Sequence, residues 1–104
     1  MRVLIVCGAG ASSTFVAQRL RRAAAARGLD IVPVPSSADA ATDLIPDVDV
    51  VIAGAHLGER VAVLGAAAAA ADVPFVVLRD AAREDGDELL DTTLAAAAAT
   101  GRTS

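Results

Sequence analysis

Aromatic and sulfur-containing side chains are nearly absent from this sequence of 104 residues. It has no Trp, no Tyr, two Phe and a single cysteine. A core must therefore be built from the Val, Leu, Ile and Ala that dominate a chain in which 55% of residues are hydrophobic. One cysteine cannot form an internal disulfide, so this thiol fits a reducing compartment and is either an inert core group or a reactive one.

Positive charge is also scarce, since nine Arg and no Lys face 13 acidic residues, for a net charge of −4. This balance argues against nucleic acid or an anionic membrane as the main partner. No apolar run approaches the ~18 residues of a membrane-spanning helix, and Met1-Arg2 leads straight into a short apolar run rather than a signal peptide. We therefore expect a cytoplasmic protein with no inserted segment.

A cluster of metal ligands is lacking too. One Cys and one His at unrelated spacing fall far short of a metal site, and no cofactor is expected.

The length fits one domain over residues 1–104. Four apolar runs, rich in β-branched residues and without alternation, are typical of strands buried on both faces. Segments of helical character separate them, which predicts an α/β fold: a four-stranded parallel open sheet with helices on both faces, a Rossmann-like three-layer sandwich. We expect the strand order 2-1-3-4. The runs are Val3–Val6, Ile31–Val34, Val48–Ala53 and Pro74–Leu78.

The first helix is expected from about Ser13 to Arg27, with Ser12 or Ser13 as N-cap and Gly28 as the C-terminal glycine. Its inward stripe is Val16, Leu20, Ala23 and Ala24, and Gln18, Arg19 and Arg22 face outward.

Three further helices follow. "SSADAATDL" predicts a short one capped by Ser36 or Ser37, with Pro46 just beyond its end. The next is expected from near Leu57 to Asp72 and includes a run of alanines, which are the best helix formers. The last is expected from about Asp87 to Thr100.

The stretch "IVCGAGASSTF" places Cys7 where the first strand ends and a helix begins. With the strand order above, this is the switch point at which open α/β sheets bind ligands. Converging backbone N–H groups and the positive end of the helix would favour a thiolate and hold a phosphate. The predicted phosphate-binding loop consists of Gly8, Ala9, Gly10, Ala11, Ser12, Ser13 and Thr14.

Three other kinds of anion site fit this stretch less well. Ser13 stands where a dinucleotide fingerprint has its third glycine. A receiver domain would end this strand in acids rather than in Val6-Cys7. A cysteine phosphatase similar to the low-molecular-weight tyrosine phosphatases would have its phosphate-clamping arginine at position 13 and an Asp-Pro pair, which the chain lacks. Phosphocysteine hydrolysis should therefore be slow, as suits a carrier.

"CGAGASST" resembles the C-x-A-G-x-S-(S/T)-(S/T) loop of IIB components of the phosphoenolpyruvate-dependent sugar phosphotransferase system, lactose/cellobiose type. "DVDVVIAG" is similar to that family's third strand and the glycine after it, and "VPFVVLRD" is similar to its fourth strand. Asp85-Gly86 falls where the family often has this pair before the last helix. The resemblance extends over nearly the whole chain.

The resemblance implies a four-stranded parallel sheet and a protein-phosphocysteine–sugar phosphotransferase. Cys7 would take a phosphoryl group from a phosphohistidine on component IIA. It would pass the group to a sugar bound by the membrane component IIC, transiently at the inner face of the membrane. A hydrolase similar to the cysteine phosphatases and a IIB-like regulatory module stay open as alternatives.

His56 departs from the cellobiose-type pattern, which has Gln two residues after the glycine that ends the third strand. Either it hydrogen-bonds a phosphate or the thiolate of Cys7, or it is a surface or helix-capping histidine. Arg60 likewise either recruits a phosphorylated partner or belongs to a solvated helix start. The charged segment 80–85 is a solvated loop or a rim that contacts a partner.

Overall fold

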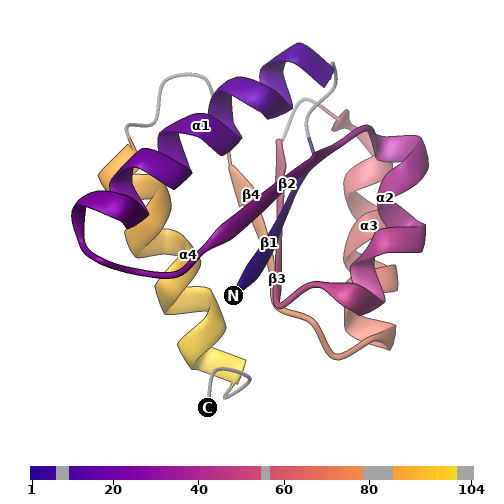
Figure 1. The fold of residues 1–104 in the computed structure, drawn as a ribbon. Helices are drawn as coiled ribbons and strands as arrows, with labels where there is room; N and C mark the ends of the chain where they lie inside the picture. Colours follow the sequence, from indigo (N-terminus) through magenta and orange to yellow (C-terminus); the bar gives the residue numbers. More distant parts are fainter. Residues whose placement is uncertain (7–9, 55–56, 79–85, 101–104) are drawn as a thin grey trace.

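The computed structural model describes residues 1–6, 10–54, 57–78 and 86–100. Within them, strands and α-helices alternate along the chain, as Figure 1 shows. The elements are β1 (Arg2–Val6), α1 (Gly10–Ala26), β2 (Val32–Ser36), α2 (Ala38–Leu44), the 3-10 turn η1 (Ile45–Asp47), β3 (Val50–Gly54), α3 (Glu59–Ala70), β4 (Phe75–Leu78) and α4 (Gly86–Thr100).

The four strands form one parallel sheet in the order β2-β1-β3-β4, which confirms the expected topology. β1 and β3 are the two central strands, and every residue of β3 is buried. Burial on both faces explains why these runs show no alternation of polar and apolar residues.

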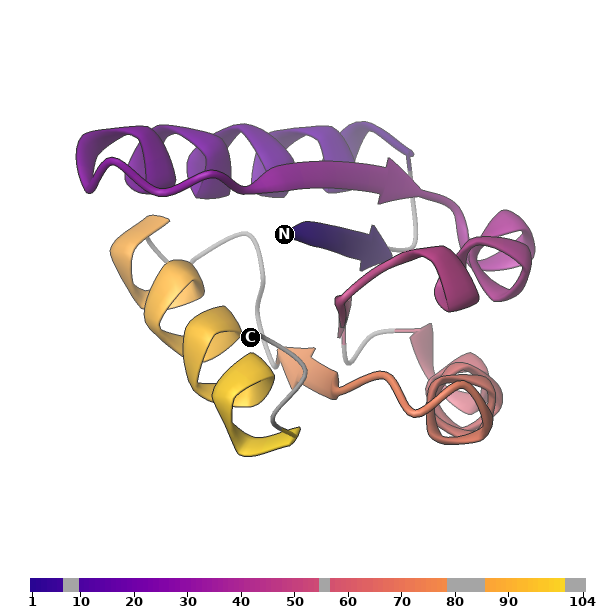
Figure 2. The same ribbon diagram turned by 60° about the horizontal axis from the view of Figure 1, so that its bottom comes forward.

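Helices cover both faces of this sheet, so the three-layer sandwich is confirmed (Figure 2). Val3 and Ile5 point into a core shared with α1 and α4. Leu4 and Val6 point to the opposite face, into a core shared with α2 and α3. The alternation of a strand's side chains between the two faces thus divides the apolar residues into two cores.

β2 runs two residues past the expected end, to Ser36, although it contains two prolines. The N–H of Val32 donates to the carbonyl oxygen of Met1 at 2.8 Å, so Val32 faces β1. Pro33 and Pro35 alternate with the residues that face β1, and their nitrogens point away from it. Since β2 is an edge strand, its pairing loses no hydrogen bond to them.

The amphipathic stripe of α1 is confirmed, because Val16, Leu20, Ala23 and Ala24 are all buried. The predicted start was wrong: the helix begins at Gly10, so Ser12 and Ser13 lie inside its first turn rather than at its N-cap. Hydroxyl residues favour the N-cap but also occur in the first turn, so they locate a helix start only to within a few residues.

Gly28 ends α1 as predicted. It has φ +70°. Its N–H donates to the carbonyl oxygen of Ala25 at 3.1 Å, and the N–H of Leu29 donates to that of Ala24 at 2.8 Å. This pair of bonds is the Schellman motif, in which a glycine takes the left-handed conformation without steric cost.

Of the two serines proposed as the cap of α2, Ser37 is the cap, since its Oγ accepts from the N–H of Ala40 at 3.4 Å. Pro46 lies beyond the end of α2, in η1, as expected. α3 is shorter than predicted and is followed by Asp72 at φ 59°, while the N–H of Val73 donates to the carbonyl oxygen of Ala68 at 2.8 Å. The alanine run thus ends in a second left-handed turn.

Candidate functional site

The candidate site follows the carboxyl end of β1. β1 ends at Val6 and α1 begins at Gly10. Cys7, Gly8 and Ala9 lie outside the described residues, and of residues 10–14 the structure describes only the backbone. The structure therefore describes the strand before Cys7 and, as the beginning of α1, the backbone of five of the seven predicted loop residues, Gly10–Thr14.

The sheet topology makes this place a switch point. From β1 the chain crosses by α1, on one face, to β2, and then returns by α2, on the other face, to β3 on the far side of β1 (Figure 1). The connections that follow the neighbouring strands β1 and β3 run in opposite directions, α1 to β2 on one face and α3 to β4 on the other, so a crevice opens between the carboxyl ends of β1 and β3. The N-terminus of α1 begins there.

The first turn of α1 differs electrostatically from those of the other helices. It contains no acidic residue. By contrast, Asp39, Glu59 and Asp87 lie in the first turns of α2, α3 and α4. An acidic side chain at that position offsets the positive end of the helix dipole. The first turn of α1 has no acidic side chain to offset the positive end of the dipole, so its N-terminus favours an external anion.

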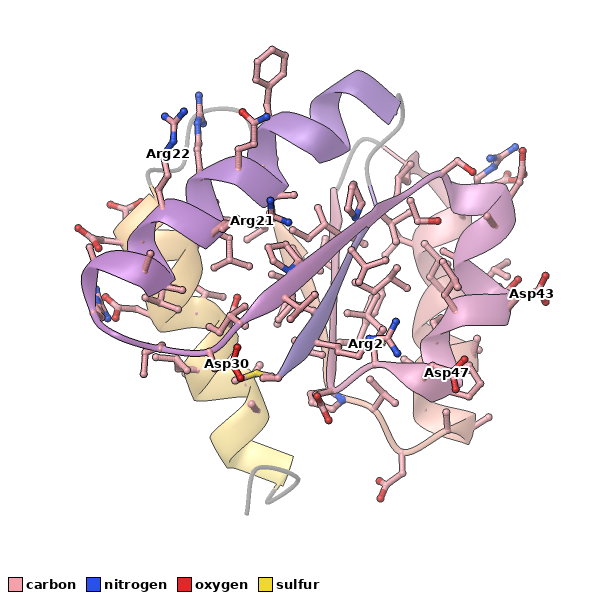
Figure 3. All side chains as sticks on the ribbon, viewed as in Figure 1. Arg2, Arg21, Arg22, Asp30, Asp43 and Asp47 are labelled. Atoms are coloured by element: carbon pink, nitrogen blue, oxygen red, sulfur yellow. The ribbon has the colours of Figure 1, made fainter. Side chains whose placement is uncertain are left out.

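The outer face of α1 carries an aromatic ring and positive charge. Phe15, in the second turn, is 66% exposed. Arg22 lies two turns further on the same face, and Figure 3 shows its side chain pointing away from the sheet. α1 contains no acidic residue. A protein that approached the beginning of α1 would meet this face.

Ser36 is a residue near the site that the sequence reasoning treated only as a helix cap. It is the last residue of β2 and pairs in register with Val6, the residue before Cys7. It is buried, and its Oγ donates to the carbonyl oxygen of Ser37 at 2.9 Å. The register of β1 and β2 identifies this position.

His56 and segment 80–85 lie outside the described residues, so the roles considered for them stay predictions. Arg60 is described. Its Nη1 forms an ion pair with Asp39 Oδ1 at 3.1 Å, from the start of α3 to the start of α2. Both side chains are largely exposed, so this is a solvated contact between two helices.

Among the described residues, no three His, Cys, Asp or Glu side chains come together as metal ligands would. None of the helices in the described ranges has the length and apolar character needed to cross a bilayer.

Comparison with known proteins places the chain in a family. The family model described as "PTS system, Lactose/Cellobiose specific IIB subunit" matches residues 2–92, which include Cys7 and the loop after it. No curated protein sequence matches the chain.

A solved structure shares the fold. The lactose-specific IIB component domain of the phosphoenolpyruvate:carbohydrate phosphotransferase system from Streptococcus pneumoniae superposes with a TM-score of 0.82 at 15% sequence identity. The match covers 92% of this chain and 96% of that one. At this identity the likeness establishes the fold, while the family model establishes the family.

Proposed function

The chain belongs to the lactose/cellobiose-specific IIB family of the sugar phosphotransferase system, and from this premise we propose that it is a phosphoryl carrier with Cys7 as its covalent site. Cys7 accepts a phosphoryl group from a phosphohistidine on component IIA. It donates the group to a sugar bound by the membrane component IIC during uptake. The family match across residues 2–92 carries this proposal, because it spans the loop that begins at Cys7.

The start of α1 supports a phosphate at this place. A phosphocysteine carries about two negative charges. The positive end of a helix of 17 residues, whose first turn has no acidic residue, offsets part of that charge. The backbone N–H groups of a first turn have no partner inside the helix and can donate to phosphoryl oxygens.

Two substitutions at phosphorus make up the transfer. The Cys7 thiolate attacks the phosphorus of the phosphohistidine, so that an S–P bond forms while the N–P bond breaks and its electron pair stays on the imidazole. A sugar hydroxyl then attacks the same phosphorus and loses its proton, an O–P bond forms, and the thiolate leaves. Both steps depend on alignment more than on acid–base chemistry.

Ser13 supports a carrier over a hydrolase. A cysteine phosphatase clamps the phosphate with an arginine at this position and protonates the leaving group with an aspartic acid from an Asp-Pro pair, and the sequence has neither. The phosphocysteine should therefore persist in water long enough to meet IIC. No cofactor or metal takes part in the proposed steps.

The protein would act in the cytoplasm and reach the inner face of the membrane only while docked on IIC. We include His56 as an auxiliary group that donates a hydrogen bond to the phosphoryl group. His56→Ala, which removes the donor that the family's Gln would keep, should then slow transfer from IIA by about tenfold, the loss of one charge-assisted hydrogen bond. It should leave the adduct on Cys7, and an unchanged transfer rate would remove His56 from the site.

Intact-protein mass spectrometry tests the covalent step. The chain is incubated with phosphoenolpyruvate, the general phosphotransfer proteins and a cognate IIA, with Cys7→Ser as the matched control. One phosphate should appear on the wild type and none on the variant. The proposal fails if no adduct forms, or if Cys7→Ser carries an adduct with the same acid and alkali lability. Turnover of an aryl phosphate that disappears in Cys7→Ala would indicate a hydrolase instead.

A further inference from the structure

Positive charge in this acidic chain is concentrated on α1. The helix has three arginines and no acidic residue, whereas α2 and α4 have acidic residues and no basic one. The chain as a whole carries a net charge of −4. Its net charge repels an acidic partner, while α1 attracts one locally and so sets the direction from which that partner approaches.

One side of α1, away from its buried residues, is exposed and carries part of this charge. Gln18 and Arg19 follow Phe15 by three and four residues, and Arg22 follows it by seven, so these four exposed residues share a face of the helix. This face, Phe15, Gln18, Arg19 and Arg22, is called the α1 stripe below. Aromatic rings and arginines are the side chains that are enriched at protein–protein interfaces.

A protein that exchanges a phosphoryl group at the start of α1 covers this stripe. A standard interface buries about 800 Å² on each partner, which extends roughly 15 Å from its centre. At about 1.5 Å per residue, Phe15 lies about 8 Å along the axis from Gly10, and Arg22 about 18 Å. Long helical side chains lean toward the N-terminus, which brings the guanidinium of Arg22 closer to the site. Phe15 is thus placed well inside such a contact, and Arg22 at its rim.

We propose that the α1 stripe recognises the phosphoryl donor, component IIA, through an acidic surface of that protein, and does not recognise the acceptor IIC. This inference rests on the proposed function, in which both partners reach the start of α1 in turn. Charge separates the two, because the cytoplasmic loops of a membrane protein such as IIC carry an excess of Lys and Arg. Those loops repel the arginines of the stripe, so the stripe is assigned to the donor.

The association rate of the chain with unphosphorylated IIA tests the proposal without any phosphoryl transfer. The IIA used is one that phosphorylates the wild type. Arg22→Glu should lower the association rate constant about tenfold at low salt, and Arg22→Gln by less, because a charge at an interface rim acts mainly on encounter. The difference should shrink at high salt. Arg21→Glu is the matched control, since it makes the same change in charge on the next residue, about 100° around the helix.

Discharge to the acceptor is measured separately. Wild type and Arg22→Glu are phosphorylated with excess IIA, and loss of the adduct is followed after membrane vesicles that contain IIC are added with the sugar. Arg22→Glu should discharge at the wild-type rate. Circular dichroism shows whether each variant is folded, and substitutions at the exposed Arg21 and Arg22 should leave the helix intact.

Equal association rates for the wild type and Arg22→Glu overturn the proposal, as does an equal loss in Arg21→Glu or a loss that high salt does not reduce. Slower discharge of Arg22→Glu to IIC also overturns it, because the stripe would then bind the acceptor or the anionic lipid around it. If no IIA phosphorylates the wild type, the proposed function fails and this inference fails with it. If IIA phosphorylates the wild type but associates equally with Arg22→Glu, this inference alone fails.

Discussion

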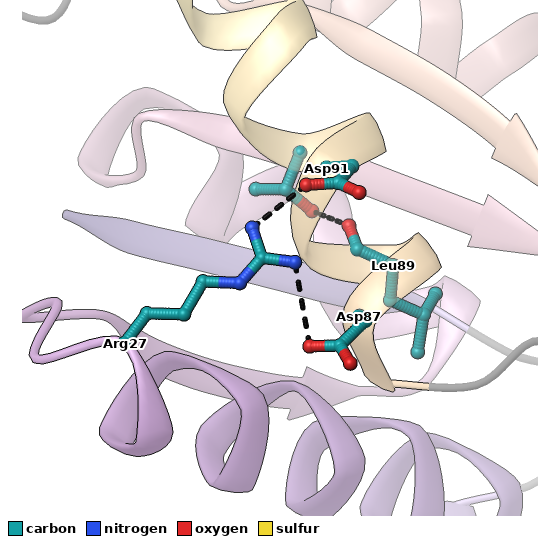
Figure 4. Close-up of polar contacts among 5 residues, drawn as sticks. Arg27, Asp87, Leu89 and Asp91 are labelled. Carbon is teal, nitrogen blue, oxygen red and sulfur yellow. Dashed lines mark hydrogen bonds and ion pairs between the residues drawn. The ribbon is translucent and has the colours of Figure 1, made fainter.

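Arg27 Nη1 donates to Asp91 Oδ1 over 2.7 Å and joins the end of α1 to the second turn of α4 (Figure 4). Its Nη2 reaches Asp87 Oδ1, in the first turn of the same helix, at 3.3 Å. The hydrogen bond to Asp91 is the main reason why the pKa of Arg27 is raised. One guanidinium thus holds two helices that are separated by most of the sequence.

Arg27→Ala should lower the melting temperature by a small amount, because the carboxylates are largely exposed and water screens the pair. A double-mutant cycle with Asp91→Asn should give a coupling that shrinks in high salt. Because the pKa of Arg27 is raised in the folded state, the stability that its ion pair contributes is fully present below the ordinary arginine pKa. That stability is lost only as pH rises through the higher pKa of the folded state. Changing pH around neutrality should therefore leave the coupling intact, and a coupling insensitive to salt would contradict this account.

Gly28→Ala should destabilise the protein by about 1 kcal/mol, the cost of a left-handed conformation for a residue with a Cβ. No atom lies within 4 Å of where that Cβ would be, so the loss of stability measures the cost of the backbone conformation without a steric clash. Urea unfolding measures it, and Gly28→Asn should cost less because Asn tolerates this conformation. Equal losses for Ala and Asn would show that φ is not the cause.

Gly65→Ala should stabilise the protein by up to about 1 kcal/mol, because alanine replaces glycine in the interior of α3. The new methyl group would meet the Phe75 ring at 3.4 Å, an ordinary contact distance. Thermal unfolding measures the gain, and Ala66→Gly at the exposed neighbouring position should give a loss of similar size. A destabilised Gly65→Ala would mean that the Phe75 ring cannot yield.

Phe15→Ser should leave stability within about 0.5 kcal/mol, since the ring is mostly exposed. If Cys7 accepts a phosphoryl group from IIA, the variant should slow that transfer about tenfold or more, because an exposed aromatic beside the site is typical of interface hot spots. Val63→Ser is the control, being 60% exposed on α3. Transfer slowed equally by both substitutions would count against a specific role for Phe15.

Four strands and the two helical layers could be predicted because the apolar runs report burial directly, whereas the strand order 2-1-3-4 was assumed and is confirmed by the structure. Val3–Val6 and Val50–Gly54 have no polar positions, and only a central parallel strand buries both faces. Gly28 was predictable because one local conformation at a helix end selects glycine.

Other features depend on contacts between distant residues. The place of Ser36 beside Val6 needs the strand register, which neither strand specifies alone. The pairing of Arg27 with Asp91 depends on how α1 and α4 pack against each other. The sequence pattern of surface charges does not show which charged residues will lie together. The end of β2 was not predicted because prolines fit only an edge strand, and the sequence alone does not show that this strand lies at the edge of the sheet.

The position of β1 between β2 and β3 affects how the chain can fold during synthesis. The ribosome makes β1 before either strand that flanks it, yet four of its five residues are buried in the finished protein. Until residues 50–54 emerge, one side of this apolar strand has no native partner. The nascent chain therefore has an interval in which β1 is open to wrong pairing or to a chaperone, and slowing translation before β3 should lengthen that interval.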